Sequence, residues 1–127
     1  MATARDIAAY IKEKSPAPMP RSKLNGLMYF TQAWSMAWTG KPVFAEPIKA
    51  HASGPEVVGL GNVDSLRGHP VDDATEAVLE RVLRKYADMS TRWLLDLVTT
   101  EVPFVEARAA NPGATIKLES LALHYGK

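Results

Sequence analysis

The sequence contains no cysteine, which excludes disulfide bonds, thiolate zinc sites and cysteine nucleophiles. Its three histidines (His51, His69 and His124) lie far apart, and none is spaced like a metal-binding pair such as HxxxH. The loop "GNVDSLRG" (61–68) is not followed by Lys-Ser or Lys-Thr, so it is no phosphate loop. These absences remove the usual carriers of cofactor and metal chemistry, and we expect neither a cofactor nor a metal.

Two groups of polar residues remain as catalytic candidates, and each has a simpler explanation. Asp72 and Asp73 resemble paired carboxylates, but they stand at the expected start of a helix, where capping accounts for them. Glu101, Glu106 and Arg108 could face a cleft, yet an acidic pair with an arginine is equally an ordinary salt-bridged surface. The residues alone therefore predict a protein that is not an enzyme.

Long apolar runs are also missing. The opening "MATARDIAAYIKEK" carries charges at Arg5, Asp6, Lys12 and Glu13 and has no signal-peptide core. No run approaches the ~20 apolar residues of a membrane-spanning helix. Fifteen basic and fourteen acidic side chains leave a net charge of +1, which gives no general attraction to nucleic acid. We therefore expect a cytoplasmic protein that binds neither membrane nor nucleic acid.

What the sequence has is an aromatic stretch, "LMYFTQAWSMAWTGKPVF" (27–44). A membrane anchor, a base-stacking platform, a cofactor pocket and a buried helix would all use these residue types. Between Met28 and Trp38 there is no charged side chain, whereas single-strand binders interleave aromatic and basic residues. A helix that is apolar on almost every side is typical of a buried central position. We expect this helix to run from Pro20 or Arg21 to Thr39, with a core spine of Leu24, Leu27, Phe30, Trp34 and Trp38.

The remaining segments predict one small, mostly helical domain covering residues 1–127. Thr3 and Asp6 have the spacing of a capping box at the start of a first helix. Asp72, Ser90 and Pro103 mark the starts of three later helices, and a last apolar segment ends near Tyr125. Prolines and β-branched residues predict a short extended or β-hairpin insert near 43–58. The predicted fold class is a compact helical bundle around a buried central helix, with this small insert.

Four motifs, in order along nearly the whole chain, together resemble the Panacea domain, also met as a phage-associated or Soc-type antitoxin domain. They are "DIAAYI" (6–11), "KLNGLMYFTQAWSMAWTGKPVF" (23–44), "IKAHASGPEV" (48–57) and "VLRKYADMSTRWLLDLVTTEVPFVEAR" (82–108). Ile116 and Tyr125 match the family's final isoleucine and aromatic residue. Five residues depart from its pattern: Gly26, His51, Glu56, Thr100 and Phe104. Thr100 stands where the family has a histidine, which argues further against a catalytic histidine here.

The resemblance implies an antitoxin that neutralises a cognate protein toxin, encoded by an adjacent gene, through direct binding. The alternatives are a proteolysis adaptor that delivers the toxin to a cytoplasmic protease, and a phage-encoded regulatory or anti-defence binding protein. The candidate toxin contacts, which we expect to be exposed, are Lys41, Pro42, Gly54, Pro55, Glu56, Thr100, Glu101, Phe104 and Arg108. Gly54 and the prolines among them could equally serve only to shape the backbone.

Overall fold

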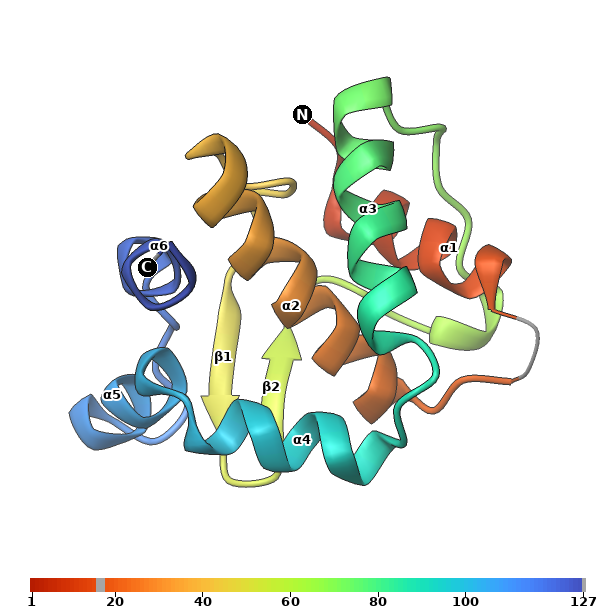
Figure 1. Cartoon of the computed structure of the whole chain (residues 1–127). Helices are drawn as coiled ribbons and strands as arrows, with labels where there is room; N and C mark the ends of the chain where they lie inside the picture. Colours follow the sequence, from red (N-terminus) through yellow and green to blue (C-terminus); the bar gives the residue numbers. More distant parts are fainter. Residues whose placement is uncertain (16–17, 127) are drawn as a thin grey trace.

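The first helix, α1 (Ala4–Lys14), begins at the predicted capping box. The Thr3 hydroxyl accepts a hydrogen bond from the Asp6 backbone N–H at 3.1 Å, and the Asp6 carboxylate accepts one from the Thr3 N–H at 2.9 Å. The structure is a computed structural model that describes residues 1–15 and 18–126. In that part of the chain it contains six α-helices and one two-stranded antiparallel sheet (Figure 1), which confirms the predicted mostly helical, single-domain fold.

Helix α2 (Arg21–Thr39) is the central element of this fold, as predicted. It packs against α1, α3, α4, α6 and strand β2, and it crosses the middle of the molecule in Figure 1. Gly40 ends it with a left-handed backbone (φ 73°), which glycine adopts without steric cost, and donates its N–H to the Met36 carbonyl.

The insert forms a hairpin of strands β1 (Ile48–His51) and β2 (Gly54–Val57). Along the outer edge of β1, the segment 113–116 runs beside the strand and bonds to it. Ala50 donates its N–H to the Ala114 carbonyl at 2.9 Å, and Ile116 donates to the Ile48 carbonyl at 2.8 Å. This segment therefore covers the edge of β1 without being a regular strand.

The outer edge of β2 lies against α2 and is covered by a side chain. The Val57 N–H donates to the Asn25 side-chain oxygen at 3.0 Å, and the other outward position of β2 is Pro55, which has no N–H. The buried amide of Asn25 thus fixes the hairpin to the central helix.

Four more helices complete the bundle. They are α3 (Asp73–Tyr86), α4 (Thr91–Thr100), α5 (Val102–Ala110) and α6 (Leu118–Tyr125), and a short 3₁₀ turn (Val63–Ser65) precedes α3. Asp72 and Ser90 cap α3 and α4 as predicted, and Pro103 lies in the first turn of α5. None of the helices within residues 1–15 and 18–126 is long and apolar enough to span a bilayer.

The core confirms three of the five residues of the predicted spine and corrects the other two. Leu24, Leu27 and Phe30 are fully buried. Trp34 and Trp38 are only partly buried and lie at the edge of the core. The reason is that they lie on the C-terminal half of α2, where Arg81 of α3 covers Trp38 and Lys85 of α3 covers Trp34, so that charged side chains rather than a full apolar layer lie over them.

Candidate functional site

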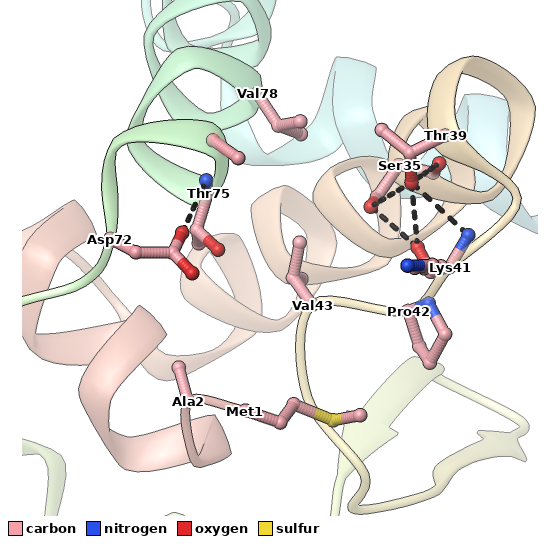
Figure 2. Close-up of a pocket in the computed structure, with 11 residues that line it drawn as sticks. Met1, Ala2, Ser35, Thr39, Lys41, Pro42, Val43, Asp72, Thr75 and Val78 are labelled. Carbon is pink, nitrogen blue, oxygen red and sulfur yellow. Dashed lines mark hydrogen bonds between the residues drawn. The ribbon is translucent and has the colours of Figure 1, made fainter.

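The C-terminal end of α2 borders a pocket of about 510 Å³, and the predicted contact residues Lys41 and Pro42 are among those that line it (Figure 2). Its other lining residues come from the N-terminus, α2 and the start of α3: Met1, Ala2, Ser35, Thr39, Val43, Asp72, Ala74, Thr75 and Val78. Most of these side chains are aliphatic. A pocket of this composition suits an apolar group of a binding partner.

Ser35, Thr39 and Asp72, which line this pocket, form hydrogen bonds with backbone groups. Ser35 donates its hydroxyl to the Lys41 carbonyl at 2.6 Å, and the Thr39 hydroxyl donates to the Ser35 carbonyl at 2.8 Å. The Asp72 carboxylate accepts the Thr75 N–H at 2.8 Å, and this backbone hydrogen bond lowers the pKa of Asp72. Asp72 is therefore ionised near neutrality and acts as a helix cap.

Gly54 and Pro55 were predicted to be exposed contacts, and this prediction is wrong because β2 packs against α2 and α4. Gly54 has φ +138°, and a Cβ there would lie 3.2 Å from a methyl carbon of Leu95, so glycine is required by both backbone and space. Glu56 is exposed, as predicted, and lies 3.6 Å from His51 across the hairpin.

Glu101 was also predicted to be an exposed contact, but its side chain is buried, with only 8% exposed. One carboxylate oxygen, Oε1, accepts hydrogen bonds from the hydroxyls of Tyr29, at 2.9 Å, and of Tyr125. The other, Oε2, lies 3.7 Å from Nε2 of His124. We call these four residues the Glu101 cluster; it joins α2 and α6 at the corner between α4 and α5.

The tyrosines of the Glu101 cluster are held in their protonated form. Burial, reinforced by the neighbouring Glu101 carboxylate, raises the pKa of Tyr29 far above that of a free tyrosine. Burial and the hydrogen bond to Glu101 do the same to the pKa of Tyr125. Because both phenols stay protonated at ordinary pH, they remain hydrogen-bond donors to Glu101 and join α2 to α6 through it.

The rest of the predicted stretch 100–108 is divided between surface and core. Phe104 is buried on the inner face of α5, which corrects its prediction as an exposed contact. Thr100 is exposed and donates its hydroxyl to the Leu97 carbonyl of its own helix, at 2.8 Å. Arg108 is half-buried and donates to the Ala50 carbonyl of β1 at 3.3 Å.

The predicted contacts therefore do not form one site. Lys41 and Pro42 follow the C-terminal end of α2, whereas the hairpin turn lies at the opposite end of the molecule (Figure 1). Two cations that were not among the predicted contacts, Arg81 and Lys85, cover Trp38 and Trp34. Because they are four residues apart on α3, their spacing predicts that they lie on the same helix face. It does not predict which residues that face contacts.

Within residues 1–15 and 18–126, no group of three or more His, Asp or Glu side chains is arranged to hold a metal ion. Comparison of the chain with protein-family models, with curated proteins and with solved structures found no match. Membership of the Panacea family accordingly stays a prediction from the sequence motifs.

Proposed function

We propose that this protein is an antitoxin of the Panacea type, a non-enzymatic cytoplasmic protein that neutralises a cognate protein toxin by binding it directly. The observation that carries the proposal is the ordered series of four motifs over nearly the whole chain. Each motif falls on a distinct part of the fold: α1, then α2 with its terminal turn, then the hairpin, then the end of α3 with α4 and α5.

Contacts between and within the motifs support this assignment of the series. Tyr29 of the second motif bonds to Glu101 of the fourth. The Gln32 side chain donates to the Phe44 carbonyl at 2.9 Å and accepts the Val43 N–H at 2.8 Å, which closes the "GKPVF" turn onto α2. These buried motif residues stabilise the fold, so we place toxin contact on exposed side chains of the same segments.

The surface of α5 supports protein binding within the predicted stretch 100–108. Val102 is 58% exposed and Val105, one turn further on, is 49% exposed. Neighbouring apolar side chains on a short surface helix suit burial against a partner, where they would lose contact with water. We place toxin contact here and at Lys41–Pro42, beside the apolar pocket.

The test is co-expression with the product of the adjacent gene. That product should arrest growth when expressed alone, and growth should resume when this protein is present. The proposal fails if the neighbouring product is harmless alone or remains toxic in the presence of this protein.

Surface variants then test where the toxin binds. Val102→Glu combined with Val105→Glu should weaken neutralisation, because the two charges would have to be buried at the contact. Val58→Glu is the control for a charge added at an exposed valine, since Val58 is 41% exposed, directly follows β2 and lies outside the stretch. Equal neutralisation by all three proteins would remove α5 from the proposed interface.

The two alternatives differ in what happens to the toxin. Direct inhibition predicts a stable complex in size-exclusion chromatography and an unchanged toxin half-life. A proteolysis adaptor would shorten that half-life in a protease-dependent way. A phage regulatory or anti-defence protein would produce its phenotype without any adjacent toxin.

A further inference from the structure

A row of aromatic side chains joins α2, α3 and α4 beside the core. We call it the cation–aromatic patch and define it by six residues: Trp34, Trp38, Tyr86, Trp93, Arg81 and Lys85. Trp34 and Trp38 stack with ring centroids 5.0 Å apart, and the Trp34 indole N–H donates to the Tyr86 hydroxyl at 2.9 Å. Trp93 of α4 extends the row, 6.5 Å from the Tyr86 ring, and is 44% exposed.

Two exposed cations of α3 lie over this row. The Arg81 guanidinium is 3.7 Å from the centroid of the Trp38 ring, and the Lys85 ammonium is 4.6 Å from that of Trp34. Among residues 1–15 and 18–126, the ion pairs are His51–Glu56, Arg92–Asp96 and His124–Glu101, so neither cation has a carboxylate partner there. The aromatic faces orient the two charges but do not neutralise them.

We infer that the cation–aromatic patch is a docking surface for an acidic segment of a partner protein. Carboxylates of such a segment would pair with Arg81 and Lys85, while its apolar side chains would contact the partly exposed rings of Trp34, Trp38 and Trp93. Tryptophan and arginine in this combination are the residues that most often dominate binding energy at protein interfaces. The inference concerns the chemistry of the partner and holds whether or not that partner is a toxin.

The arrangement favours a protein segment over a single-stranded nucleic acid. Base stacking on a series of bases needs several free ring faces. Arg81 occupies a face of Trp38, Lys85 lies over Trp34, the two indoles stack on each other, and Tyr86 stacks on Phe30 at 4.2 Å. Within residues 1–15 and 18–126, Trp93 is the one ring of the patch with neither a stacked ring nor a cation over it, and a single ring does not make a stacking platform. Carboxylates need only the outer sides of the cations, which are exposed.

Intrinsic fluorescence tests the inference directly, because all three tryptophans of the chain belong to the patch. The probe is a synthetic peptide of about twelve alternating Asp and Leu residues, long enough to cover a surface of this kind. A Lys/Leu peptide of the same length and an oligo(dT) of similar length serve as comparisons. We expect saturable binding of the Asp/Leu peptide alone, weakening as salt rises from about 0.05 M to about 0.5 M.

Variants assign the binding to the patch. Arg81→Glu with Lys85→Glu should weaken binding of the Asp/Leu peptide about tenfold or more, because like charges then meet. Arg67→Glu with Lys117→Glu makes the same change in net charge at two other exposed positions and should leave binding unchanged. Arg81→Met with Lys85→Met keeps apolar cover over the rings and removes only the charge, so it should also lose binding. This second pair supplies the test even where the Glu pair misfolds.

Three results would overturn the inference: no binding of the Asp/Leu peptide to the wild type, equal loss in the control pair, or tighter binding of oligo(dT). Because the probe is a synthetic peptide, these results are independent of the growth test for toxin neutralisation.

Discussion

Replacing Glu101 by Ala should destabilise the protein severely, although Glu101 lies in a loop between two helices. Its Oε1 accepts two tyrosine hydroxyls, and hydrogen bonds to a charged group contribute about 1.5–3 kcal/mol each. The Tyr29 side chain is fully buried, so its hydroxyl would be left without a partner. We expect a loss of about 3–5 kcal/mol in the free energy of unfolding, which is a large part of the roughly 5–15 kcal/mol of a typical domain.

Glu101→Gln is the matched control, because the amide oxygen can still accept both hydroxyls. It should cost only about 1–2 kcal/mol, since neutral hydrogen bonds are weaker than those to a carboxylate. Urea denaturation followed by far-ultraviolet circular dichroism measures both variants. Should Glu101→Ala lie within about 0.5 kcal/mol of the wild type, or the two variants be equal, the Glu101 cluster does not hold α2 and α6 together.

Three further outcomes are expected. Burial raises the pKa of Asp6, but hydrogen bonds from the Thr3 and His69 N–H groups outweigh this effect and leave the pKa lowered. The stabilisation from Asp6 is therefore present above about pH 4 and is lost as the pH falls below this value. Asp6→Asn should therefore flatten the acid limb of a plot of melting temperature against pH, and an unchanged limb would contradict this cause. Trp34→Ala should cost about 3 kcal/mol in urea, the low end for aromatic residues because Trp34 is only partly buried, and a variant that melts normally would show that α2 does not depend on it. Gly54→Ala should lower thermal stability by at least about 1 kcal/mol, from the strained φ and the contact with Leu95, while Gly26→Ala, whose new Cβ meets only ordinary contacts at 3.7 Å, should cost less.

The helices α1 to α5 could be predicted from the sequence because each of them carries its own start or stop signal. The Thr3–Asp6 capping box, the caps Asp72 and Ser90 and the terminal Gly40 are local features, and all lie where the sequence placed them. Such signals act over one helical turn, so no knowledge of the tertiary fold is needed to find them.

The burial of individual side chains was less predictable, because it depends on which elements meet. The sequence predicts Glu101 to be a surface acid, because nothing near it in the chain shows that α6 places Tyr125, 24 residues further on, against its carboxylate. The sequence predicts Trp38 to be a core residue, but in the structure Arg81 of α3, and not an apolar side chain, lies over its ring. Both errors concern contacts between distant segments, which hydrophobic periodicity along one helix cannot specify.

The covered edges of the hairpin limit how any partner can engage this protein. Strand addition, a common mode of peptide recognition, needs unpaired N–H and C=O groups along a sheet edge. On β1 the segment 113–116 takes these groups, and on β2 the outward positions are Pro55, which has no N–H, and Val57, whose N–H is held by Asn25. Strand addition is therefore disfavoured at both edges, which favours recognition through side chains on the helices and loops, and the same features protect the hairpin from edge-to-edge aggregation.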